Sequence, residues 1–295
     1  IGSGYGLVAC HVILLYCSTA GNILISGGKV TIKAGDYAAG IGSGWWGIIG
    51  NITISGGEIN VETSNADSYG NGAGIGAGRV GLAGNIEITD GTIKATGNNY
   101  GVGIGAGAYA TVENIMISGG TVTASGGTYG AGIGSGYSNT TDNSNIKTIT
   151  ISGGTVTAKA GASAAGIGQG DGGSCVGVQI TGGSVKAMDS NGTVNSILPS
   201  PKYDDSTDAQ LLVLEGKAEI DPIVIDNTTW SFAGKHPDND ENLYVYLTPE
   251  NHKAKLGEIG CLVIYKSEDK TFVIRYAGYL EIKDSDGNTA TTGYT

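Results

Sequence analysis

The sequence predicts an all-β protein whose larger part is a parallel β-solenoid. Two short motifs alternate along residues 1 to about 190, the distance between their copies is nearly constant, and apolar and polar residues alternate within each copy. We therefore expect about six rungs of 29 residues over residues 1–197. A linker over 198–208 and a small antiparallel domain of β-sandwich type over 209–295 are expected to follow.

The first motif reads I-x-I-S-G-G-x-V/I. Its second isoleucine recurs at Ile25, Ile54, Ile88, Ile117, Ile151 and Ile180. The second motif reads G-I-G-S/A-G. Its isoleucine recurs at Ile41, Ile75, Ile104, Ile133 and Ile167, and Ile1 opens a partial copy. Steps of 16 and 13 residues alternate between the motifs, which sets the period at 29, and insertions near 5–21, 63–71 and 138–145 are expected in loops.

Within each period the alternation is that of strands. Ile52 and Ile54 share one face and Thr53 lies on the other, and Ile59 and Val61 resume the pattern after two glycines. Each buried Ile or Val contributes about 1.5–3 kcal/mol once neighbouring rungs cover it. Four asparagines occupy one place in the repeat and predict a ladder of stacked amides: Asn22, Asn51, Asn85 and Asn114.

These motifs resemble the right-handed parallel β-helices of the pectate-lyase-like superfamily. They are more closely similar to the ITISGG-type repeats in surface and carbohydrate-binding proteins of anaerobic bacteria. The resemblance covers about residues 1–190 and implies a right-handed β-helix. It implies little about activity, because many β-helices with such rungs are not catalytic.

Glycine occupies every second position around the isoleucine of the second motif. If Ile41 faces the core, Gly40, Gly42 and Gly44 face outward and leave a surface with almost no side chains. Two interpretations remain open: another surface approaches this strip closely, or a stacked corner tolerates glycine. The second interpretation is favoured.

Aromatic residues flank this glycine strip. We take six as candidate ligand-binding residues: Tyr37, Trp45, Trp46, Tyr100, Tyr129 and Tyr137. Their rings could stack on the apolar faces of sugars, as in many polysaccharide-binding surfaces. Alternatively the rings pack at a corner, because the residues four before or after each isoleucine share its inward parity in an unbroken strand.

Groups that could perform catalysis are scattered. The carboxylates of the repeat region fall at different places in the repeat, Arg79 is its only arginine, and the histidines lie in no triad-like context. We therefore expect no enzyme and no cofactor. A polysaccharide lyase or glycosidase is the alternative, and it requires carboxylates that converge in one groove. Asp284, Asp286 and Asn288 are weak calcium candidates, for which a hairpin turn is the preferred interpretation.

The net charge of −11 and the lack of a basic cluster argue against nucleic acid or an anionic membrane as partner. The longest apolar stretch, residues 7–17, has about half the ~20 residues that a membrane helix needs, so we expect no membrane insertion. Residues 7–16 instead predict a segment that either caps the first rung or packs on a preceding domain. Cys10 and Cys17 either form a disulfide or remain thiols.

We expect a non-catalytic extracellular domain of a bacterial surface or secreted protein, acting as an adhesin, a stalk or a polysaccharide-binding module, with a polysaccharide or a host or cell-surface glycan as its partner. Further domains of a longer parent protein are expected as well. Ice binding by a flat face is a further alternative, but its threonine column is broken. That column reads Thr31, Asn60, Lys94, Thr123, Thr157 and Lys186.

Strands in the second domain are expected over 211–214, 223–225, 243–247, 262–265 and 272–280. Turn residues separate these stretches of alternating polarity. No binding motif accompanies them, so we expect a spacer or an end cap.

Overall fold

The computed structural model describes residues 19–64, 70–139, 145–220, 222–230, 232, 235–276, 281–283 and 289–291. The chain forms two compact units. One consists of Ile1–Glu219 and Ser231–Thr248, and the other of Ile220–Trp230 and Pro249–Thr295. The expected cap at 7–16, Cys10, Cys17 and the calcium candidates Asp284, Asp286 and Asn288 lie outside the described residues.

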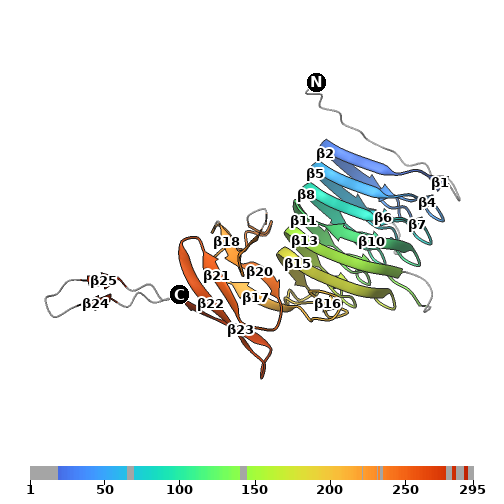
Figure 1. Ribbon diagram of the computed structural model, residues 1–295. Helices are drawn as coiled ribbons and strands as arrows, with labels where there is room; N and C mark the ends of the chain where they lie inside the picture. The colour runs from blue at the N-terminus through green and yellow to red at the C-terminus, as the bar shows by residue number, and fades with distance from the viewer. Residues whose placement is uncertain are drawn as a thin grey trace. The chain divides into compact units, whose positions relative to one another are not determined.

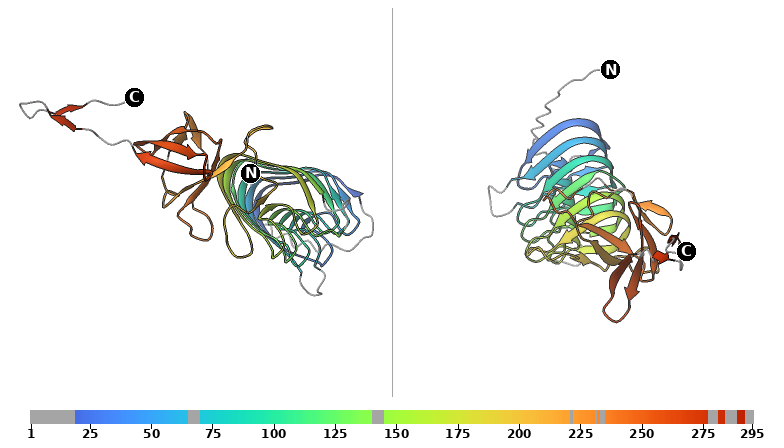
Figure 2. Two further views of the ribbon diagram at one scale, coloured as in Figure 1. Left: turned by 90° about the horizontal axis from the view of Figure 1, so that it is seen from below. Right: turned by 90° about the vertical axis from the view of Figure 1, so that its left-hand side faces the viewer.

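The first unit is a parallel β-solenoid, as expected, with its rungs stacked from β2 to β15 (Figures 1 and 2). One sheet contains the long strands β2 (Ile23–Ala34), β5 (Ile52–Thr63), β8 (Ile86–Thr96), β10 (Thr111–Ile117), β11 (Thr121–Ser125), β13 (Asn145–Lys159) and β15 (Ser174–Met188). The short strands β1 (Thr19–Ala20), β4 (Ile48–Ile49) and β7 (Leu82–Ala83) extend it. The second sheet contains β3 (Ile41–Gly42), β6 (Ile75–Ala77), β9 (Ile104–Ala106), β12 (Ile133–Ser135), β14 (Ile167–Gly168) and β16 (Ile197–Leu198).

Strand register confirms the repeat arithmetic. Ile25 pairs with Ile54, and Ile54 pairs with Ile88 although five extra residues separate them in the chain. The equivalent inward positions fill one continuous core. For example, Ile52, Ile54 and Val61 are fully buried. Apolar side chains at equivalent positions therefore cover one another from rung to rung, which supplies the burial that no single rung can provide.

The expected asparagine ladder is present. Asn22 Oδ1 accepts the backbone N–H of Asn51 at 2.8 Å, and Asn51 Oδ1 accepts that of Asn85 at 2.9 Å. Asn114 Nδ2 donates to Asn85 Oδ1 at 2.8 Å. The amides thus hydrogen-bond both to the backbone and to each other, and they satisfy polar groups at one corner of the solenoid.

The expected open glycine surface is wrong. The glycines beside the motif isoleucines are mostly buried, and their backbones approach the next rung closely. Gly76 has a φ of +136°, and a Cβ placed there would lie 2.0 Å from the Gly105 carbonyl oxygen. Glycine is therefore required at this column by rung-to-rung contact and by its left-handed backbone, and no open strip is left for a ligand.

The solenoid continues past the expected boundary at 197. Ile197 and Leu198 of β16 pair with β14, and Lys202 forms a parallel bridge to Gln179. An antiparallel pair, β17 (Gln210–Leu214) and β20 (Leu243–Leu247), belongs to the same compact unit. Tyr246 of β20 is fully buried in the solenoid core, so these two strands close the C-terminal end of that core. This division of the chain differs from the expected linker over 198–208 and second domain from 209.

The second unit contains an antiparallel sheet, which confirms the expected strand direction. Its order is β19 (Thr228–Trp230), β18 (Ile223–Ile225), β21 (His252–Leu256), β22 (Ile259–Lys266) and β23 (Thr271–Tyr276). The sequence pattern missed β19 and β21. A further antiparallel pair joins β24 (Glu281–Lys283) and β25 (Thr289–Thr291). No helix in the described part of the chain is long and apolar enough to cross a membrane.

Candidate functional site

Two columns of residues in the solenoid flank the short sheet formed by the second motif. The first column contains the residue four before each isoleucine: Tyr37, Asn71, Tyr100, Tyr129 and Ser163. The second contains the residue four after it: Trp45, Arg79, Ala108, Tyr137 and Asp171. Backbone hydrogen bonds hold the columns together, since the N–H of Arg79 donates to the Tyr37 carbonyl at 2.8 Å and that of Tyr137 donates to Tyr100 at 3.1 Å.

Chain turns on both sides of these strands explain why the rings lie at the surface. The strands β3, β6, β9 and β12 are only two or three residues long, so inward parity does not extend four residues beyond the isoleucine. Tyr37, Tyr100 and Tyr137 are each half-buried. The rings consequently pack on one another while part of each remains accessible to solvent.

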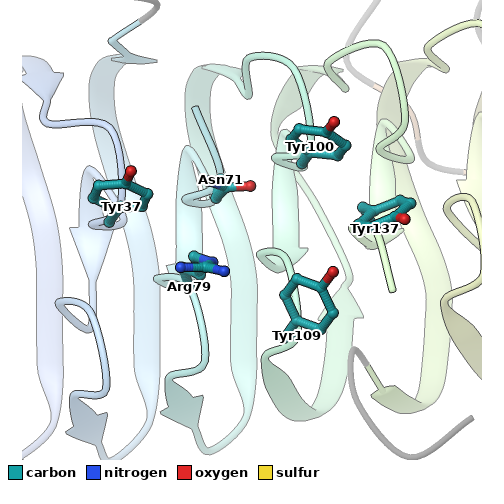
Figure 3. A pocket seen from close by; sticks show the side chains of 6 residues that line it. All are labelled: Tyr37, Asn71, Arg79, Tyr100, Tyr109 and Tyr137. Carbon is teal, nitrogen blue, oxygen red and sulfur yellow. The ribbon is translucent and has the colours of Figure 1, made fainter. Parts of the chain in front are cut away.

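The columns border a pocket of about 420 Å³. Figure 3 shows its six described lining side chains on successive rungs: Tyr37, then Asn71 with Arg79, then Tyr100 with Tyr109, and finally Tyr137. Four tyrosines, an amide and a guanidinium thus face one concave surface. Rings for stacking and a few convergent polar groups are the usual composition of a ligand site.

Two groups of stacked rings lie at either end of this pocket. Tyr37 stacks on Trp45 with 5.1 Å between ring centroids and 29° between planes. Tyr100 stacks on Tyr129 at 4.8 Å and 12°, and Tyr137 packs against Tyr100 at 4.8 Å with a tilt of 57°. Contacts of this kind contribute about 0.5–1.5 kcal/mol each beyond the area they bury, and they fix the orientation of the rings.

Arg79 lies between these groups of rings. Its guanidinium carbon is 5.7 Å from the centre of the Tyr37 ring, 6.0 Å from that of Trp45 and 5.6 Å from that of Tyr109. Burial and the neighbouring Tyr137 raise the pKa of Tyr109 although the positive charge of Arg79 opposes them. Tyr109 therefore remains a neutral hydroxyl that can donate or accept a hydrogen bond.

The six candidate residues have different positions in the structure. Tyr37, Tyr100 and Tyr137 line the pocket, while Trp45 and Tyr129 stack behind them. Trp46 does not line it. It is 52% exposed and has a left-handed backbone with a φ of +56°.

Three lining residues were missed by the sequence prediction: Asn71, Arg79 and Tyr109. The first two could have been found with the same rule, because they stand four residues before and four after Ile75. Neither residue is aromatic, so the pattern of flanking rings did not include them. Tyr109 stands five residues after Ile104, where it shares the left-handed backbone of Trp46 and Val80.

A second cluster of polar side chains covers the last rungs of the solenoid. Lys186 Nζ lies 2.5 Å from Asp238 Oδ2 and 2.6 Å from Asp240 Oδ2, and its side chain is only 9% exposed. Burial alone would raise the pKa of Asp240, but hydrogen bonds from Lys186 and Tyr244 lower it to about 2. Burial likewise opposes the charge on Lys186, yet its hydrogen bonds to both carboxylates raise its pKa. This arrangement is a charged clamp that fixes the segment 235–248 on β15.

His236 belongs to the same clamp. Its Nδ1 lies 2.8 Å from Thr157 Oγ1, and its Nε2 lies 2.8 Å from Ser184 Oγ. Burial, followed by the positive charge of Lys186, lowers the pKa of His236 to about 4, so the imidazole is neutral near pH 7. Ser184 and His236 resemble a nucleophile and its base in spacing, but both are buried and Thr157 stands where a carboxylate would orient the ring.

The clamp also changes the interpretation of the broken threonine column. Register places Thr157 beside Lys186, as the repeat predicts. Both residues are buried rather than outward and solvent-exposed. No group of three or more His, Cys, Asp or Glu side chains suited to a metal occurs among the residues that the structure describes.

Comparison with known proteins identifies the repeat. The model of a family described as beta helix repeat matches residues 23–45, 52–79, 86–108, 115–137 and 149–168. These segments are beta helix repeats. The match and the parallel sheets fit a right-handed β-helix, consistent with the pectate-lyase-like superfamily. Searches of the curated proteins and of the solved structures found no significant match.

Proposed function

We propose that the solenoid is a non-catalytic saccharide-binding module of an extracellular or cell-surface bacterial protein, and that the tyrosine pocket is its binding site. The observation that carries the proposal is the set of half-buried rings around one concave surface: Tyr37, Tyr100, Tyr109 and Tyr137. Sugar rings present apolar C–H faces, and aromatic faces held rigidly by their neighbours bind such surfaces with little loss of side-chain entropy.

Polar groups in the pocket suit the hydroxyls of a sugar. Asn71 contributes an amide and the tyrosines contribute hydroxyls, which are groups that pair with sugar hydroxyls, and Tyr109 and Tyr137 are already joined by a side-chain hydrogen bond. Tyr100 and Tyr137 pack against each other, so neither ring needs to be ordered when a ligand arrives. Successive rungs approach each other closely at their glycines, so the strands that carry these rings form a rigid scaffold.

A glycan array tests this proposal, followed by calorimetric titration of the glycans that bind. We expect Tyr100→Ala and Tyr137→Ala each to weaken binding about tenfold, because each removes a stacking face worth roughly 1 kcal/mol or more. Tyr276→Ala is the matched control, since this tyrosine lies in the second unit and is 51% exposed. Retention of no glycan by the wild-type protein would leave the stalk interpretation.

The enzymatic alternative is tested on the same samples. Glycans that bind are incubated with the protein, and release of reducing ends or of unsaturated products is measured over time. We expect neither. Product release that disappears in Tyr100→Ala would contradict a purely binding role.

A further inference from the structure

The cation at the centre of the tyrosine pocket has no partner that neutralises it among the described residues. The ion pairs of those residues involve other groups, and Arg79 contributes to none of them. Its Nε atom is buried and has no hydrogen-bond partner there. Contact with three rings stabilises a positive charge, but a cation–π contact supplies no oxygen acceptor for the N–H donors of the guanidinium.

The described lining of the pocket contains no carboxylate. Its six side chains are four tyrosines, one asparagine and Arg79. The chain carries a net charge of −11, so an anionic ligand meets repulsion at long range. That repulsion is screened beyond about 8 Å at physiological ionic strength, whereas a guanidinium in direct contact with an oxyanion is screened much less. The contact inside the pocket therefore decides the preference.

We infer that the pocket selects acidic saccharides, with Arg79 as the residue that binds the carboxylate or sulfate group. This inference rests on the proposed saccharide-binding function and adds the charge of the ligand. A planar guanidinium matches a carboxylate or sulfate with two parallel hydrogen bonds. Because Nε is buried, the two hydrogen bonds to a ligand would come from the terminal Nη1 and Nη2 groups.

The order of the side chains along the solenoid sets the placement of the acidic sugar. Tyr37 lies one rung before Arg79, and Tyr100 lies one rung after it (Figure 3). Rungs are about 4.8 Å apart, so the two groups of rings are separated by roughly 10 Å along the axis. An acidic unit held by Arg79 would therefore have neighbouring sugar units within reach of rings on both sides, which requires at least a trisaccharide.

Three matched hexasaccharides test this inference: β-1,4-linked glucose, glucuronic acid with the same linkage, and glucose sulfated at O6. They are titrated into the full chain alongside the glycans found on the array. We expect acidic members to bind at least tenfold more tightly than neutral ones of the same backbone. Comparing the affinities of the glucuronic acid and the sulfated hexasaccharides shows whether a carboxylate or a sulfate is preferred.

Variants of Arg79 test whether this residue causes the tighter binding of acidic glycans. Arg79→Met keeps an apolar stem between the rings and should remove the tenfold preference, while Arg79→Lys should retain part of it. Lys94→Met is the matched control, because this exposed lysine lies on β8 outside the described pocket lining. Circular dichroism checks that each variant is folded.

Three outcomes are distinguishable. A preference for acidic glycans that falls in Arg79→Met but not in Lys94→Met supports the inference. Equal binding of neutral and acidic glycans, or equal weakening of both by Arg79→Met, overturns it and leaves the proposed function intact. Binding of no glycan overturns both.

Discussion

Arg79 and Lys186 are two cations held against the same solenoid, and their surroundings differ completely. Lys186 contacts the carboxylates of Asp238 and Asp240 and is almost fully covered. Arg79 contacts aromatic rings, lines an open pocket and forms no ion pair with any carboxylate that the structure describes. A cation with its counterions inside the protein fixes a segment of the fold, whereas one without a protein counterion is available to a ligand.

The largest effect on stability is expected at the close contact between successive rungs in the core that carries both cations. Gly76→Ala introduces a Cβ into a left-handed position 2.0 Å from the Gly105 carbonyl. We expect a loss of about 4 kcal/mol in the free energy of unfolding, measured in urea.

Gly44→Ala is the control for this substitution, because a Cβ at Gly44 would meet no atom within 4 Å. We expect the control to change stability by less than about 0.5 kcal/mol. Equal effects of both changes would show that rung-to-rung contact does not require glycine at position 76.

The clamp gives the next largest effect. Lys186→Met leaves two carboxylates facing an apolar side chain, and we expect a loss of about 3 kcal/mol in urea unfolding. Lys94→Met is matched to it, because Lys94 occupies the same column of the repeat but is exposed. A small effect of Lys186→Met would mean that Asp238 and Asp240 are solvated well enough without their partner.

The pH dependence of stability sharpens the description of the clamp. The folded pKa of His236, about 4, lies below its usual value of 6.5, so the unfolded chain binds the proton more readily. Stability is then fully present above pH 6.5 and is lost as the pH falls toward 4. From this residue alone we expect a loss of about 2 kcal/mol between pH 7.5 and pH 5.

His236→Gln isolates that contribution. Its amide cannot titrate, so the difference in unfolding free energy between wild type and variant should shrink by about 2 kcal/mol as the pH falls from 7.5 to 5. A constant difference across this range would contradict a neutral, buried imidazole. Other acidic groups titrate in both proteins and cancel in the comparison.

The smallest effect on stability is expected for Arg79→Met. Among the residues that the structure describes, the recorded side-chain contacts of the guanidinium are with rings, and the methionine side chain replaces part of them, so the loss should stay below about 1 kcal/mol. A loss as large as that of Lys186→Met would show that Arg79 serves the fold and would remove the contrast between the two cations.

The repeat was predictable because it is encoded locally. Alternation with a period of two places Ile52 and Ile54 inward, and equal spacing stacks them on Ile86 and Ile88 whatever lies elsewhere in the chain. The same arithmetic located Tyr37, Tyr100 and Tyr137, and applied to Ile75 it would also have located Asn71 and Arg79. It could not show that the rings face outward, because parity is lost in the turns beside a strand of two or three residues.

Contacts between residues far apart in the sequence were decided only by the tertiary structure. The carbonyl of Gly105, which fills the space beside Gly76, belongs to another rung. The carboxylate of Asp238, which pairs with Lys186, lies 52 residues further along the chain. Nothing in the local pattern near 198–248 signals that Tyr246 closes the solenoid core. The sequence by itself determined the rungs, since these depend on short-range periodicity. Three-dimensional packing between distant segments determined the pocket, the clamp and the end of the solenoid.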